Sequence, residues 1–206
     1  MKRLKFRTLA TFAFSLMCIG FMSAQSGFGI RAGINFANQN ISVDGIGDLD
    51  TDSKGGLDVA ILYNAAFESG FAIQPEIHYA QSGYKGEITI NNLTQEVVAE
   101  LNYVQVPILF KFDVLGVTDN ISLSPFIGPY VALGVTGDVQ DIEIDWDEDY
   151  NRLDYGGVLG VMLQFTPGFF VDARYNFGLA NIAHDEDSDR IEIKNAIFGL
   201  GVGFIF

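Results

Sequence analysis

Cysteine is almost absent from this chain of 206 residues, because its single cysteine, Cys18, lies near the N-terminus. This scarcity excludes a disulfide framework and leaves no basis for thiol chemistry. Histidine occurs only twice and proline only five times. The sequence also lacks a glycine-rich phosphate loop, a cluster of metal ligands at a recognised spacing and a cofactor motif. Catalysis therefore has little support from the residues themselves.

Positive charge is scarce as well. The chain has 12 lysines and arginines against 26 aspartates and glutamates, a formal charge of −14, while 49% of its residues are hydrophobic. A nucleic-acid partner is excluded, because binding to phosphate requires a basic surface. The combination of acidity and hydrophobicity indicates that the two kinds of residue occupy different zones of the molecule.

The N-terminal segment has the order of regions found in a secretory signal peptide. Four basic residues precede an apolar run from about Leu9 to Met22, and Ser23-Ala24 follows. The alternative is a retained membrane anchor, but the run is short for a membrane-spanning helix. We expect a signal peptide at residues 1–24 and one mature domain at residues 25–206. Cleavage removes Cys18 and four basic residues, which leaves eight basic against 26 acidic residues, a formal charge of −18.

Beyond the signal peptide, apolar residues recur at every second position, which is the pattern of β-strands. In the first such segment Phe28, Ile30 and Ile34 share one face, and Arg31 lies on the other. No later run is long and apolar enough for a membrane-spanning helix. We expect about eight strands, most near ten residues long. They fall at residues 28–36, 57–67, 71–81, 101–112, 121–135, 155–165, 169–178 and 195–206.

The two faces of these strands decide where the protein resides. One face is uniformly large and apolar, whereas the other mixes small residues with charged ones. A soluble barrel or sandwich would bury the large apolar face, but small residues and ion pairs suit the narrow interior of a small barrel in lipid. Since every strand edge must be paired in a membrane, the sheet must close. We predict an all-β fold, an eight-stranded antiparallel up-and-down transmembrane β-barrel.

The connections alternate in length, as they do in outer-membrane barrels. We therefore expect the outer membrane of a Gram-negative bacterium, with the long loops extracellular and the short turns periplasmic. Long loops are expected near residues 37–56, 85–99, 136–153 and 179–191, and short turns near residues 68–70, 113–120 and 166–168.

The chain ends in "GLGVGFIF", in which glycines alternate with large apolar residues. We expect this last strand to pair with the first and close the barrel, its apolar side chains facing lipid. Three glycines on the opposite face leave room in a crowded interior. The terminal aromatic residues, Phe204 and Phe206, resemble the signal that the barrel-assembly machinery recognises during biogenesis.

Several stretches resemble a known family. They are "GIRAGINFA" (29–37), "YVQVPILFKF" (103–112), "PFIGPYVALGV" (125–135), "ARYNFGLANI" (173–182) and "KNAIFGLGVGFIF" (194–206). The chain is similar to the outer-membrane β-barrel proteins of Bacteroidetes, the porin-family or PorT-like proteins. The resemblance implies an outer-membrane location and an eight-stranded barrel, and PorT itself is tied to protein secretion. Gln105 departs from the pattern, since an acidic residue is expected there, and this leaves Lys111 without its expected partner.

Charged residues on the inward face form the first candidate site. Their number suits ion pairs that cross-link neighbouring strands in a lumen filled by side chains. The alternative is a polar path for a solute. The predicted lumen ion pairs involve Arg31, Glu76, Lys111, Asp172 and Arg174.

Acidic residues in the predicted outer loops form the second candidate. Asp145, Asp147 and Asp149 have the spacing of a calcium loop, but Tyr150 stands where an EF-hand needs glycine, so an EF-hand is rejected. Loop-bound Ca²⁺ or Mg²⁺ bridging to lipopolysaccharide is one interpretation. A solvated, repulsive surface is the other. Beyond such loop-bound ions, we expect no cofactor.

These observations predict an integral outer-membrane protein that is not an enzyme. His78 and Ser82 both face inward, but a hydrolase also needs an orienting carboxylate and an oxyanion hole. We expect a structural, adhesive or partner-docking role through acidic extracellular loops. The expected partners are outer-membrane lipid, lipopolysaccharide and possible secretion-system or surface proteins. The alternative is a PorT-like accessory of protein secretion or a narrow solute conduit.

Overall fold

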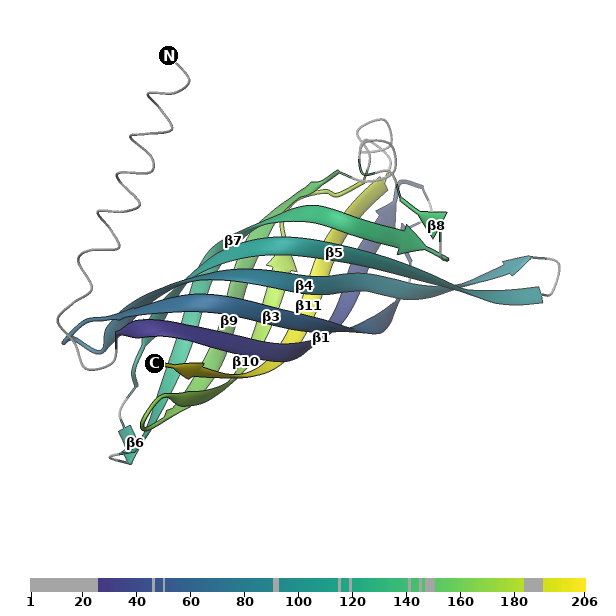
Figure 1. Ribbon diagram of the computed structural model, residues 1–206. Coiled ribbons are helices and arrows are strands. Elements are labelled where there is room, and N and C mark those ends of the chain that lie inside the picture. Colours follow the sequence, from purple (N-terminus) through teal and green to yellow (C-terminus); the bar gives the residue numbers. More distant parts are fainter. Residues whose placement is uncertain are drawn as a thin grey trace, which may run out of the picture.

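The chain forms a closed, tilted β-barrel with long strands (Figure 1), seen here in a computed structural model. The predicted signal peptide at residues 1–24 lies outside the described residues. No helix in the described part has the length and hydropathy needed to cross a membrane. The structure describes residues 26–45, 47–49, 51–90, 93–114, 116–118, 120–140, 142–144, 146, 151–183 and 191–206.

Eight long antiparallel strands make the barrel wall, as the alternation predicts. Seven of them are longer than the expected ten residues, and β10 has ten. The strands are β1 (Gly27–Val43), β3 (Asp52–Ala66), β4 (Phe71–Ile90), β5 (Leu93–Phe112), β7 (Ile121–Val139), β9 (Leu153–Phe165), β10 (Phe169–Gly178) and β11 (Ile191–Ile205).

Each long strand pairs with the next one along the chain, and the last pairs with the first. The closing seam between β1 and β11 runs from Gly29↔Ile205 to Val43↔Ile191 without a register shift. The backbone N–H of Phe206 also donates to the carbonyl of Phe28. The prediction that the final strand closes the barrel is therefore confirmed, and the glycine-rich C-terminal segment lies in the wall rather than at a free edge.

The short turns lie where they were expected, between β3 and β4, β5 and β7, and β9 and β10. We call this end, at which β1 begins and β11 ends, the terminal end of the barrel, and the opposite end the loop end. The expected long loop at residues 85–99 is wrong, because β4 and β5 continue as a hairpin as far as Ile90 and Leu93. Three short strands lie outside the main path: β2 (Gly47–Leu49), β6 (Gly116–Thr118) and β8 (Ile142–Glu143).

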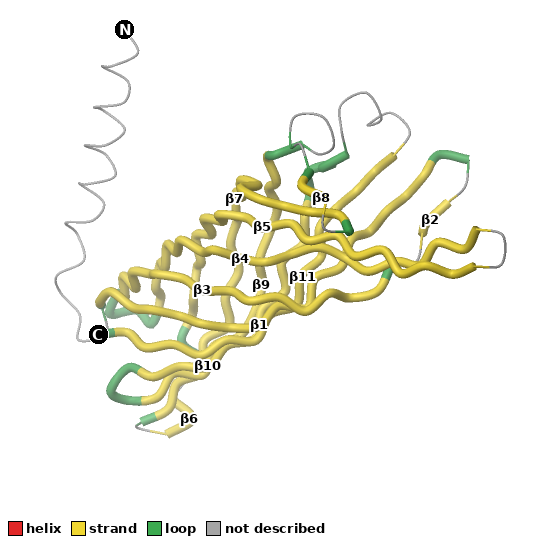
Figure 2. The backbone as a smooth tube through the Cα atoms, turned by 45° about the vertical axis from the view of Figure 1, so that its right-hand side comes forward, coloured by secondary structure: helices red, strands yellow, loops and turns green. Residues whose placement is uncertain are grey.

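The outer surface is apolar around the wall, which is the arrangement that lipid requires. Phe28, Ile30 and Ile34 of β1 are about half exposed, as are Phe198 and Val202 of β11. The residues between them along each strand point inward and are buried. Figure 2 shows the strands lying side by side between the terminal end and the loop end.

The interior differs from the prediction in one respect. Small residues and charges were expected there, but two clusters of large apolar side chains also fill it. The first lies toward the terminal end and contains Leu62, Leu109, Phe126, Val158, Met162, Phe170 and Ile205. The second lies toward the loop end and contains Leu101, Tyr103, Tyr130, Ala132, Ile144, Trp146, Ala180 and Ile182. Glycines on neighbouring strands make room for aromatic rings such as those of Phe126 and Phe170. The alternation of residues therefore predicted which side chains point inward, but it did not predict that large apolar side chains would fill the interior.

Candidate functional site

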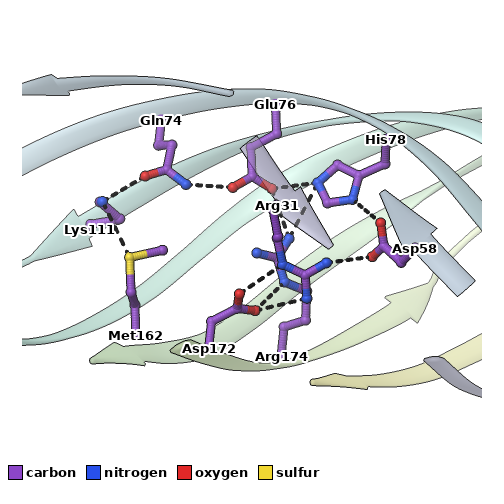
Figure 3. Close-up of polar contacts among 9 residues, drawn as sticks. All are labelled: Arg31, Asp58, Gln74, Glu76, His78, Lys111, Met162, Asp172 and Arg174. Carbon is purple, nitrogen blue, oxygen red and sulfur yellow. Dashed lines mark hydrogen bonds and ion pairs between the residues drawn. The ribbon is translucent and has the colours of Figure 1, made fainter. Parts of the chain in front are cut away.

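Six charged side chains form a closed ring in the middle of the barrel interior (Figure 3). Arg31 comes from β1, Asp58 from β3, Glu76 and His78 from β4, and Asp172 and Arg174 from β10. Each occupies an inward position of its strand, at most 5% exposed. We call these six residues the ionic ring.

Arg31 forms one side of the ionic ring. Its Nη1 donates to Asp58 Oδ2 at 2.8 Å. On the other side, its Nε donates to Asp172 Oδ2 at 2.7 Å and its Nη2 to Asp172 Oδ1 at 3.0 Å. This bidentate contact holds the plane of the guanidinium in one orientation and pairs its positive charge with the Asp172 carboxylate.

Glu76, His78 and Arg174 complete the ionic ring. His78 Nδ1 lies 2.7 Å from Asp58 Oδ1, and His78 Nε2 lies 2.5 Å from Glu76 Oε2. Arg174 donates from Nη1 to Glu76 Oε2 and from Nε to Asp172 Oδ1, both at 2.8 Å. Its guanidinium carbon also lies 5.6 Å from the centre of the Phe126 ring, within range of a cation–π contact.

The geometry balances the charge of the ionic ring. Both nitrogens of His78 face carboxylate oxygens, and only an imidazole that carries two protons can donate to both. With His78 charged, three cations face three anions. Neutrality matters here, because an uncompensated charge out of water is very unfavourable.

The Arg174–Glu76 contact crosses the full width of the barrel. In the order of the closed sheet, three long strands separate β4 from β10 in either direction. The two side chains are almost fully buried, at 2% and 0% exposure. The contact therefore lies across the lumen, where a solute path would have to run.

Lys111 lies in the same interior, but the prediction that it forms an ion pair is not what the structure describes. Its Nζ donates to Gln74 Oε1 at 2.7 Å and lies 3.7 Å from Met162 Sδ, and neither atom carries a charge. Gln74 Nε2 in turn donates to Glu76 Oε1 at 2.5 Å. The ammonium is thus linked to the ionic ring through the amide of Gln74.

The glycines of the last strand make space for the ionic ring. A Cβ at Gly201 would lie 2.4 Å from the guanidinium carbon of Arg31. A Cβ at Gly203 would lie 2.2 Å from the Phe170 ring. Real side chains do not approach so closely, so any larger residue at these positions displaces Arg31 or Phe170. This explains why small residues alternate with apolar ones at the C-terminus.

A second polar group lies on the loop side of the ionic ring and adjoins the apolar cluster there, of which Tyr130 is a member. Asn195 donates to Asp154 Oδ2 at 3.0 Å and accepts from Gln39 Nε2 at 3.1 Å. Tyr130 donates to the same Asp154 oxygen at 3.2 Å. With an apolar cluster toward each end, the interior is packed by side chains at successive levels.

The acidic loop candidates Asp145, Asp147 and Asp149 lie outside the described residues. Among the residues that are described, no group of three or more histidine, cysteine, aspartate or glutamate side chains is arranged to hold a metal ion. At the C-terminus, Phe204 and Phe206 stack edge to face, with ring centres 5.4 Å apart, and Phe206 is 74% exposed.

Sequence reasoning missed part of the ionic ring. Asp58 and His78 were placed on the inward face, but they were not recognised as members of the site. Their inward register was a usable signal, because His78 lies two positions from Glu76 on the same face. The polar group around Tyr130, Asp154 and Asn195 depends on side chains meeting from separate strands, and no local pattern indicates it.

The closed eight-stranded sheet, its lipid-compatible outer surface and its packed interior define a small transmembrane β-barrel of the outer membrane. The family described as "Outer membrane protein beta-barrel domain" matches residues 22–184. This match covers well over half of the chain, so the chain belongs to that family and is an outer-membrane protein.

The chain also shows low-level similarity to solved structures of other bacterial proteins. Neisserial surface protein A is 16% identical, with 88% of this chain and 98% of that chain covered at a TM-score of 0.49. OprG from Pseudomonas aeruginosa is 11% identical, with 88% and 97% covered at 0.48. Ail, the attachment invasion locus protein of Yersinia pestis, is 16% identical, with 87% and 99% covered at 0.43. Similarity at this level assigns no function. A comparison with curated proteins finds no match.

Proposed function

We propose that this protein is a non-conducting outer-membrane barrel with a structural or adhesive, partner-docking role at its loop end. The observation that carries this proposal is the Arg174–Glu76 contact, which crosses the lumen between opposite strands at 2.8 Å. A solute would have to break several buried ion pairs at once, which is costly because each charge would lose its partner out of water. A barrel closed in this way acts through its surface.

The loop end is the surface that we propose for docking, and we propose that it is extracellular. The buried charged residues balance: four are basic (Arg31, Lys54, Lys111 and Arg174) and four are acidic (Asp58, Glu76, Asp154 and Asp172). The acidic excess of the chain therefore lies on its other residues. Such a surface favours basic partners, and divalent cations are the natural bridge to lipopolysaccharide.

The contacts of His78 support a role other than catalysis. Both of its nitrogens are occupied by carboxylates, at 2.7 Å from Asp58 and 2.5 Å from Glu76. A general base needs a free nitrogen within reach of the proton that it removes. His78 and Ser82, which both face inward in the sequence pattern, are thus poorly suited to act as the base and nucleophile of a hydrolase.

Ion flux through the refolded barrel tests the closed lumen. Protein in planar bilayers is expected to give no steady channels, whereas Arg174→Ala, which removes the bridge across the lumen, is expected to give transient openings. A matched control is Lys194→Ala, because Lys194 pairs with Glu192 at the exposed loop end of β11. Steady channels in the unaltered protein that Arg174→Ala abolishes or Lys111→Glu alters would refute the proposal and favour a narrow conduit.

A second candidate is a PorT-like accessory of protein secretion in a member of the Bacteroidetes. The stretches "VPILFKF" and "ARYNFGL" favour it, since they resemble that family. Affinity capture from native outer membranes distinguishes the two candidates. Recovery of secretion components with the unaltered protein would favour the accessory role, and capture of surface partners alone would favour adhesion or docking.

A further inference from the structure

The hairpin formed by β4 and β5 continues beyond the barrel wall (Figures 1 and 2). On one side, β3 is paired with β4 as far as Asp52↔Lys85. On the other side β7 accompanies β5 as far as Ala99↔Val139, and Gln140 N donates to Val98 O. Within the described chain, residues 86–90 and 93–97 then pair only with each other.

Within the part of the chain that the structure describes, no other strand pairs with either outer edge of this projecting hairpin over five residues. An open edge presents alternate N–H and C=O groups, which an extended strand satisfies along its whole length. Natural proteins usually protect such edges with lysine, proline or very short strands. Residues 86–97 contain no lysine, arginine or proline, and they include Ile88, Thr89 and Ile90, which favour strands.

Charge indicates which kind of strand fits this edge. The register places Glu87 directly opposite Glu96. These two glutamates are the charged residues of the segment 86–97, which therefore carries negative charge alone. The chain as a whole is strongly acidic, and its buried basic and acidic residues are equal in number, so the acidic excess lies elsewhere. Charge complementarity therefore favours a partner segment that carries lysine or arginine.

We propose that an edge of the β4–β5 hairpin binds an extended, basic segment of another protein by strand addition. This inference rests on the docking role proposed above and specifies the chemistry of the partner. Backbone hydrogen bonds to the edge supply the pairing, and the negative charge of the segment 86–97 favours a basic partner.

Peptide binding to the full chain in lipid nanodiscs tests the proposal. The probe is a fluorescent peptide of alternating lysine and valine long enough to span the five open residues, and the readout is fluorescence anisotropy. A peptide that alternates paired lysines with paired prolines is the control, because it has the same charge but lacks half of the N–H donors on each of its edges. We expect the lysine–valine peptide to bind and the lysine–proline peptide not to bind. Equal binding of the two peptides would overturn the proposal.

Two variants locate the binding. Replacing residues 87–96 by an Asn-Gly turn shortens the hairpin while leaving the wall intact, and heat-dependent gel mobility checks that the barrel still folds. We expect this variant to lose binding, and retained binding would overturn the proposal. Glu87→Gln with Glu96→Gln is expected to weaken binding roughly threefold to tenfold, because the segment loses both of its negative charges. Glu68→Gln, in the turn at the terminal end, is the matched control and should leave affinity unchanged.

The outcome is separable from that of the ion-flux experiment. A closed barrel that fails to bind the lysine–valine peptide refutes strand addition alone. A conducting barrel that binds the peptide refutes the closed lumen and leaves strand addition standing.

Discussion

Replacing Arg174 by methionine removes the cation that joins the two sides of the ionic ring. The substitution Arg174→Met keeps most of the side-chain length, so the contact with the Phe126 ring is largely preserved. What is lost are the two hydrogen-bonded ion pairs, each 2.8 Å long, to Glu76 and Asp172. Glu76 keeps His78 and Gln74 as partners, and Asp172 keeps Arg31.

The magnitude follows from the charge that is left behind. The ionic ring changes from neutral to a net charge of −1 in a site that excludes water. Removing one partner from a buried ion pair costs about 3–5 kcal/mol of unfolding free energy. Adding Glu76→Gln restores neutrality, so the double variant should be less destabilised than the sum of the two single variants, by roughly 2 kcal/mol.

Urea unfolding of the barrel in lipid vesicles measures these free energies. Lys194→Met is the matched control, because the Lys194–Glu192 pair is about one-third to one-half exposed, and its loss should cost less than about 1 kcal/mol. A loss below about 1 kcal/mol for Arg174→Met would refute the reasoning. Strict additivity with Glu76→Gln would refute it too, since the charges would then not be coupled.

Three further outcomes follow from the same contacts. Gly201→Ala should destabilise the barrel by about 1–3 kcal/mol, because the new methyl group displaces Arg31. The control Gly55→Ala should be nearly neutral, because its Cβ meets nothing within 4 Å. Equal losses of unfolding free energy in urea for the two variants would contradict this prediction. Lys111→Met should cost about 1–3 kcal/mol, less than Arg174→Met, because it leaves only the amide oxygen of its partner unpaired; the same titration checks the order. At the loop end, the hydrogen bond from Lys54 lowers the pKa of Glu100 from its ordinary value of 4.5. That contribution is present at neutral pH and is lost as pH falls through the lowered pKa, so Glu100→Gln should remove a small part of the acid sensitivity measured by unfolding below pH 5.

The alternation of residues predicted the wall because lipid imposes a simple rule on it. Every outward position must be apolar, and this holds for Phe28 and Ile30 on the first strand and for Phe198 and Val202 on the last. The same rule placed Arg31 and Arg174 inside. A local pattern of period two is sufficient for both conclusions, since it specifies the face of each side chain.

The partners inside the barrel could not be predicted in the same way. Arg174 meets Glu76 across the lumen, 98 positions away along the chain, and their contact depends on the tilt and stagger of eight strands. Lys111 shows the limit most clearly. Its inward position was correct, but its contact with Gln74 rather than a carboxylate depends on which side chain fills the adjacent space. The length of the β4–β5 hairpin was missed because strand-forming residues with polar neighbours also occur in loops.

Hydrogen exchange at the guanidinium groups tests the central claim most directly, namely that the ionic ring closes the lumen. In lipid nanodiscs, the Nε–H protons of Arg31 and Arg174 donate to buried carboxylates of Asp172 and should be resolved in nitrogen-edited NMR spectra. The closed lumen predicts that both exchange slowly with deuterated solvent and that Glu76→Gln accelerates exchange at Arg174. Exchange in the unaltered protein as rapid as that of a free arginine side chain would show that water passes through the ionic ring and would contradict the account.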